Sequence, residues 1–167
     1  MIKQTKNTLI LLVLLITSAC GYHLRGSVDL SEDLKNIYLQ GASSQLTKLL
    51  KKTLKSSNGQ LVDKVEQAGV VIKIEKEKMD RRVLSLDSSG RANEYELLYV
   101  VIFNLFDNKG KQLAGKQVVE VNRDYFNDQA AVLAKNNEEQ VIREEMYRQA
   151  VKSILNRAKA LLEKSKK

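Results

Sequence analysis

The chain begins with a segment typical of a bacterial export signal, and this segment ends at a cysteine. Lys3 and Lys6 precede an unbroken apolar run at residues 9–16, and small residues then lead to Cys20. The run is shorter than the roughly 20 apolar residues that a membrane-spanning helix needs. We therefore expect residues 1–19 to be a cleaved signal peptide, so that the fold comes from residues 20–167 alone.

Cys20 is the only cysteine of the sequence, so no disulfide can form within the chain. Residues 16–19 before it resemble a lipobox, although Thr17 stands where leucine is usual. An ordinary signal peptide that leaves a free thiol is the alternative. We expect Cys20 to carry an S-diacylglycerol and an N-palmitoyl group, which would hold the protein on a bilayer. Gly21 follows it in place of aspartate, which favours the outer membrane over the inner one.

The net charge limits which partners the chain can bind, and its length limits the number of domains. Signal cleavage removes two lysines and no acidic residue, so the formal net charge falls from +8 to +6. A basic periplasmic protein does not meet nucleic acid, so we expect phosphates of lipids or glycolipids, or an acidic protein surface, as counter-charges. The chain has no proline to form a rigid linker, and its length suits one domain.

Apolar residues at helical spacing predict two helices. Ser43 or Ser44 can cap the first, whose leucines lie at positions 46, 49, 50 and 54 and whose lysines point outward. Asn58-Gly59 is expected to end it. Asn136 or Asn137 is expected to cap the second, a long helix that leads to a basic tail at residues 164–167.

Alternating patterns predict strands at residues 36–40, from Val70 onward, at 94–106 and near 113–125, with turns at 88–90 and 107–110. The run from Leu97 to Phe103 is apolar at every position, so we expect both faces of the sheet to be covered there, one of them by a partner. The expected fold is α+β, with an antiparallel or mixed sheet of about four strands packed with two helices. A tether at 20–34 and a single domain at 35–163 complete the predicted organisation.

The sequence contains no pattern that indicates a catalytic residue, a metal site or a cofactor. His23 is the one histidine, and no nucleophile motif or phosphate-binding loop occurs. Glu75 and Glu77, two apart on a strand, are expected to share a face on a solvated stretch, and Glu138 and Glu139 lie at a helix start, where acids are stabilising. We do not expect an enzyme, and a carboxylate-dependent periplasmic hydrolase is the least favoured alternative.

Basic residues beside predicted turns are the candidate binding groups: Arg81, Arg82, Arg91, Arg123 and Lys135. Element ends are where a rigid scaffold presents side chains to a ligand. If the hairpin tip and the segment before the last helix meet, Arg91 and Lys135 would form a site for a phosphorylated ligand. For each residue alone, a solvated surface charge is the alternative interpretation.

Four segments in a fixed order match a known family: residues 20–25 (CGYHLR), 90–97 (GRANEYEL), 123–128 (RDYFND) with 131–135 (AVLAK), and 138–150 (EEQVIREEMYRQA). On these segments the mature chain resembles the LptE family of LPS-assembly lipoproteins, also called rare lipoprotein B. The resemblance implies an outer-membrane lipoprotein facing the periplasm. Such a protein plugs the β-barrel LptD, helps that barrel to assemble, and binds lipopolysaccharide.

The resemblance also assigns roles to residues. Cys20 matches the lipidated position, and Lys135 matches a basic position before the last helix. The family often has a basic residue shortly before the glycine of the hairpin, where this chain has Asp87-Ser88-Ser89, so Arg91 would act from the other side. A structural pilot lipoprotein for another outer-membrane complex is the alternative function.

Overall fold

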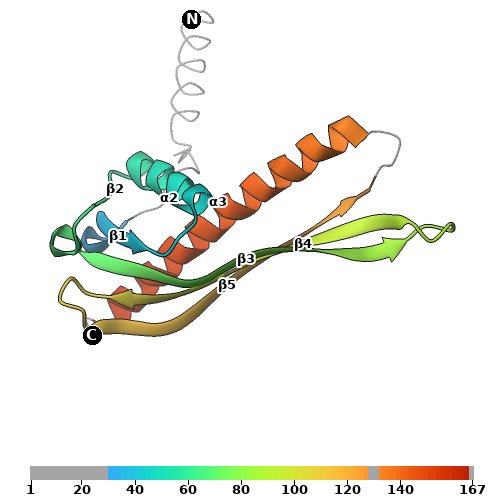
Figure 1. The fold of residues 1–167 in the computed structure, drawn as a ribbon. Helices are drawn as coiled ribbons and strands as arrows, with labels where there is room; N and C mark the ends of the chain where they lie inside the picture. Colours follow the sequence, from blue (N-terminus) through green and yellow to red (C-terminus); the bar gives the residue numbers. More distant parts are fainter. Residues whose placement is uncertain (1–29, 128–131, 166–167) are drawn as a thin grey trace, which may run out of the picture.

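The computed structural model describes residues 30–127 and 132–165, and the side chains of its last helix from 138 to 164. The described part is an α+β domain with a mixed sheet in the strand order β2-β1-β3-β4-β5 (Figure 1), which confirms the predicted fold class. The elements, in order, are η1 Glu32–Leu34, β1 Asn36–Gln40, α2 Ser44–Ser56, β2 Gln60–Leu61, η2 Val65–Gln67, β3 Val70–Leu86, β4 Ala92–Phe106, β5 Gln112–Phe126 and α3 Val132–Ser165.

The N-terminal third forms a small parallel unit. Strand β1 pairs in parallel with both β2 and β3, and α2 connects β1 to β2. Helix α2 is capped as predicted, because the Ser43 side chain accepts a hydrogen bond from the Leu46 amide at 3.2 Å. The helix ends at Ser56, and Asn58 then adopts a left-handed φ of 57°.

Strands β3, β4 and β5 form an antiparallel meander and are much longer than β1 and β2 (Figure 1). The two hairpin turns have the same hydrogen-bonding pattern. Asp87 and Asp107 each accept backbone N–H groups of their own turn, and Gly90 and Gly110 supply the positive φ angles that close it. The turns predicted from the Ser-Ser-Gly and Asn-Lys-Gly sequences are confirmed.

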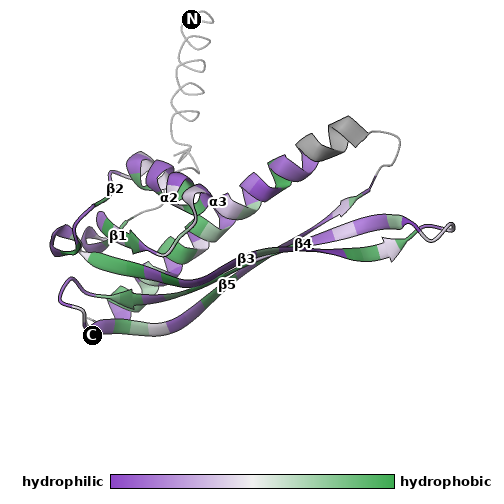
Figure 2. Cartoon of the chain, viewed as in Figure 1, coloured by the Kyte–Doolittle hydropathy of each residue, from purple (hydrophilic) through white to green (hydrophobic). Residues whose placement is uncertain are grey.

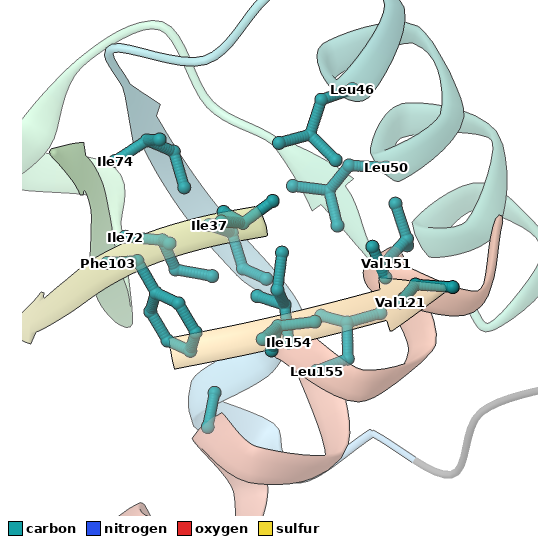
Figure 3. Close-up of a cluster of buried hydrophobic side chains, with 14 of the residues drawn as sticks. Ile37, Leu46, Leu50, Ile72, Ile74, Phe103, Val121, Val151, Ile154 and Leu155 are labelled. Atoms are coloured by element: carbon teal, nitrogen blue, oxygen red, sulfur yellow. The ribbon is translucent and has the colours of Figure 1, made fainter. Parts of the chain in front are cut away.

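The core lies between the sheet and helices α2 and α3, which cover one face of it (Figure 1). Alternate residues of β4, such as Tyr99 and Phe103, are fully buried on this face. On the other face Leu98, Val100 and Ile102 are half-buried, and no described element packs over them. The apolar run from Leu97 to Phe103 predicts that this second face is also covered. Within the described residues nothing covers it. Figure 3 shows core side chains from both layers: Ile37, Leu46, Leu50, Ile72, Phe103, Val121, Val151, Ile154 and Leu155.

Two predicted boundaries are wrong. Helix α3 begins at Val132, so Asn136 and Asn137 lie inside its first turns and do not cap it. The preceding leucine and alanine are good helix formers, and neither glycine nor proline interrupts the helix before the asparagines. The predicted tether also ends too late, because Leu34 is fully buried in the core and belongs to the folded domain.

Candidate functional site at the distal hairpin

The ends of β3 and β4 project beyond the core as a long hairpin, opposite the end that carries α2 (Figure 1). We call this end the distal region, meaning residues 81–96 with residues 123–126 of β5. The register places Arg81 and Arg123 on either side of Leu97, on the face toward α3. Arg82 pairs with Glu96 and points to the opposite face. The sheet therefore divides the predicted basic residues between its two faces.

Arg81 belongs to a network that joins the sheet to α3. Its Nη1 lies 3.2 Å from Glu139 Oε2, and the Tyr125 hydroxyl donates to the same oxygen. Arg143, one helical turn after Glu139, donates its Nε to Oε1 at 2.8 Å. The Arg81 guanidinium also lies 4.7 Å from the centre of the Tyr95 ring, a cation–π contact.

The network fixes the charge state of its members. Burial opposes ionisation of Glu139, but hydrogen bonds from Tyr125 and Arg143 outweigh it and lower the pKa of the carboxyl group. Burial and the bond to Glu139 raise the pKa of the Tyr125 hydroxyl to about 12. The hydrogen bond with Tyr125 and the bond to Glu139 raise the pKa of Arg81. At neutral pH the site thus holds one carboxylate, one neutral phenol and two guanidinium groups.

Two other predicted arginines are engaged within the protein. Arg82 forms an ion pair with Glu96, and this hydrogen bond raises the pKa of Arg82. Arg123 donates to the carbonyl of Asn122 at 2.8 Å and to the side chain of Gln149 on α3 at 2.5 Å. The Arg82 contact joins β3 to β4, and the Arg123 contact joins β5 to α3. Both arginines remain exposed at the surface.

Arg91 lies beside the exposed tip of the hairpin and is held by Asp87. The Arg91 Nε atom lies 3.2 Å from Asp87 Oδ2, and the same carboxylate accepts hydrogen bonds from the Arg91 amide and from the amide and hydroxyl of Ser89. These donors lower the pKa of Asp87 far below its usual range, with the Ser89 hydroxyl as the largest cause. Asp87 therefore compensates the charge of Arg91 at neutral pH.

The proposed convergence of Arg91 with Lys135 stays a prediction. Lys135 lies in the first turn of α3, and its side chain is outside the described residues. Glu139 meets the sheet at Arg81, and the hairpin tip projects well past the start of the helix (Figure 1). Cys20 and His23 also lie outside the described residues.

Exposed apolar side chains gather at the same end, a feature that the sequence reasoning missed. They are Val83, Leu84, Leu86 and Phe126, with relative exposures of 49, 47, 62 and 69 %. Large apolar groups at this level of exposure beside basic residues form an amphiphilic surface. The sequence does contain a sign of this surface. Three apolar residues, Val83, Leu84 and Leu86, come soon after Arg81-Arg82 and just before the predicted turn at residues 88–90.

The carboxylate pair suggested for hydrolytic chemistry is not a pair in the structure. A β-bulge between Ile74 and Lys76 interrupts the alternation of β3. Glu75 accepts a hydrogen bond from Asn104 on one face, and Glu77 accepts one from the Tyr99 hydroxyl at 2.7 Å on the other. The predicted shared face is therefore wrong. Within the described ranges no group of three or more His, Cys, Asp or Glu residues is placed to hold a metal ion, and no helix is long and apolar enough to cross a bilayer.

Comparison with known proteins identifies relatives over most of the chain. A family model described as LptE, lipopolysaccharide-assembly, matches residues 34–158. The LPS-assembly lipoprotein LptE of Pectobacterium atrosepticum is 26% identical over 158 residues, covering 90% of this chain and 83% of the relative. That of Photorhabdus laumondii is 25% identical over 146 residues, covering 86% and 79%.

Solved structures show the same fold. An uncharacterised lipoprotein B from Nitrosomonas europaea superposes with a TM-score of 0.71 at 30% identity, covering 86% of this chain and 93% of the other. The rare lipoprotein B of Shewanella oneidensis gives a TM-score of 0.68 at 29% identity, covering 79% and 99%. The similarity therefore extends from the sequence to the arrangement of helices and sheet.

Proposed function

Because this chain belongs to the LptE family of lipopolysaccharide-assembly lipoproteins, we propose that it works with the β-barrel LptD to place lipopolysaccharide in the outer leaflet. The family is one of assembly lipoproteins and not of enzymes, which argues against a carboxylate-dependent hydrolase. The observation that carries the proposal is the family match over residues 34–158, which spans nearly all of the described domain.

The proposal includes an outer-membrane location on the periplasmic side. Residues 1–19 would be removed, and Cys20 would carry the lipid anchor. Residues 20–29 would connect the anchor to the domain, which the structure describes from residue 30 onward. The half-buried aliphatic face of β4 supports a plug role, because it offers a surface that a barrel wall can cover.

The distal region is proposed as the surface that touches lipopolysaccharide. Its arginines suit phosphate groups, because guanidinium donates forked hydrogen bonds to such oxygens. The exposed Leu86 and Phe126 side chains suit acyl chains. Arg91 would have to exchange Asp87 for a phosphate of the ligand, so Asp87 acts as a competitor within the protein.

We predict that Asp87→Asn strengthens lipopolysaccharide binding by up to about fivefold, since it releases Arg91 from a surface ion pair. Arg91→Glu should weaken binding, and Arg91→Glu with Lys135→Glu should weaken it further without unfolding the protein. Binding of purified lipopolysaccharide to the full mature chain is the measurement.

Asp107→Asn is the matched control, because Asp107 holds the other hairpin turn through the same type of backbone hydrogen bonds. It should leave binding unchanged. If Asp87→Asn and Asp107→Asn behave alike, and Arg91→Glu binds as well as the wild type, the distal site is wrong.

Affinity purification of a tagged, lipidated chain from gently solubilised outer membranes tests the function itself. We expect an LptD-type barrel in stoichiometric amount, with lipopolysaccharide, and an N-terminal peptide that mass spectrometry identifies as acylated Cys20. Cys20→Ala should remain an unprocessed precursor outside the outer membrane. Recovery of a different complex would support the pilot alternative, and an unmodified mature terminus would contradict the anchor.

A further inference from the structure

Helix α2 presents a face made of lysines. Lys48, Lys51, Lys52 and Lys55 are all exposed. At 100° per residue they fall within a sector of about 100°, opposite the buried leucines of the same helix. The face is continuous from the second turn of the helix to the last.

These charges are uncompensated within the described chain. Helix α2 contains no acidic residue, and none of the ion pairs among residues 30–127 and 138–164 involves its lysines. Lys48 lies three and four residues before Lys51 and Lys52, and Lys55 follows these at the same spacings, so like charges are neighbours along the helix. Such pairs weaken a helix, whereas a face that serves solubility mixes both signs. The arrangement therefore favours an external anionic surface.

The position where the chain enters the domain indicates which surface this is. Leu30, the first described residue, packs against the core beside the C-terminal end of α2, and a Cβ atom placed on Gly59 would lie 2.9 Å from Leu30 Cδ1. Leu30 lies ten positions after Cys20. Fully extended, this segment spans at most about 35 Å, so a lipid on Cys20 holds Leu30, and with it the adjacent end of α2, within about that distance of the bilayer.

We propose that the lysine face of α2 docks on the anionic phospholipid headgroups of the bilayer that holds the anchor. This inference rests on the lipidation of Cys20 proposed above. Each lysine at an anionic surface strengthens attraction by roughly fivefold, and the attraction falls with salt. Because the distal region lies at the other end of the long sheet (Figure 1), the docked domain leaves it free for its own ligand. Figure 2 shows the hydrophilic colouring of the outer side of α2.

Lysine labelling on vesicles tests the docking. The full lipidated chain is added to preformed phosphatidylcholine vesicles, with or without phosphatidylglycerol, and a water-soluble amine reagent is applied before mass spectrometry. We expect labelling of the four α2 lysines to fall several-fold with phosphatidylglycerol and to recover in high salt. Lys109 and Lys111 in the β4–β5 turn and Lys116 on the edge strand β5 are exposed outside α2, so they serve as internal controls and should label equally in both vesicles.

A second measurement uses a fluorophore at Ser44→Cys, which lies on the same face of α2. Replacing all four α2 lysines with glutamine should abolish quenching of the fluorophore by labelled headgroups. Replacing Lys109, Lys111 and Lys116 with glutamine should leave the quenching unchanged. Vesicle-bound protein with equal labelling in both lipids overturns the docking while leaving the anchor intact. Protection that appears only on adding lipopolysaccharide also overturns it and assigns the face to glycolipid. A chain that does not float with vesicles overturns both the docking and the anchor.

Discussion

Replacing Gly41 with alanine is expected to destabilise the protein by about 2–5 kcal/mol, the sum of a left-handed backbone and a steric clash. Gly41 joins β1 to α2 with a φ of 80°. A Cβ atom at this position would lie 2.5 Å from the backbone carbonyl oxygen of Ile74 on β3. Neither group can move freely, because Ile74 is held in the centre of the sheet.

Gly110→Ala is the matched control for the Gly41 substitution. Gly110 has nearly the same φ, 84°, but a Cβ atom there would meet nothing within 4 Å. It should cost only the backbone strain, about 1–2 kcal/mol. Chemical denaturation of the full mature chain measures both variants. Equal losses would show that the approach of Gly41 to β3 contributes nothing to stability.

The local elements were predictable from the sequence because their signals are local. Strand β1 and helix α2 follow from alternation, leucine spacing and a serine cap, all within residues 36–59. The hairpin turns follow from aspartate and glycine at fixed offsets. Strand β2 could not be predicted, because two residues carry no periodicity and its pairing with β1 depends on tertiary contacts.

The candidate site was predictable only residue by residue. Arg81, Arg82, Arg91 and Arg123 are at the surface of the distal region, as expected of residues near strand ends. The partner of each arginine within the protein decides whether that arginine is available to a ligand. Some of these partners are close to the arginine in sequence, and others are distant. Asp87 is four residues from Arg91 and belongs to a recognisable turn, whereas Glu139 is far from Arg81 in sequence and meets it only because α3 crosses the sheet. The bulge that separates Glu75 from Glu77 likewise has no sequence signal.

Glu139→Gln is expected to lower the free energy of unfolding by about 1–3 kcal/mol at neutral pH. The glutamine can still accept a hydrogen bond from Tyr125, but the ion pairs with Arg81 and Arg143 are lost. The range allows for solvent screening, because both arginines are partly exposed. Helix α3 should then separate more readily from the distal end of the sheet than from the core.

The pH dependence of this loss identifies its cause. The pKa of Glu139 is lower in the folded protein than in the unfolded chain, so its contribution is complete above the ordinary glutamate pKa and disappears as pH falls through the folded value. The difference in stability between wild type and Glu139→Gln should therefore be constant near neutral pH and shrink in acid. Asp87 also loses its contribution in acid, but it does so in both proteins and cancels from the difference. Glu144→Gln, an exposed position on the same helix, should show no such difference. A loss for Glu139→Gln that persists unchanged in acid would mean that packing, and not the carboxylate charge, joins α3 to the hairpin.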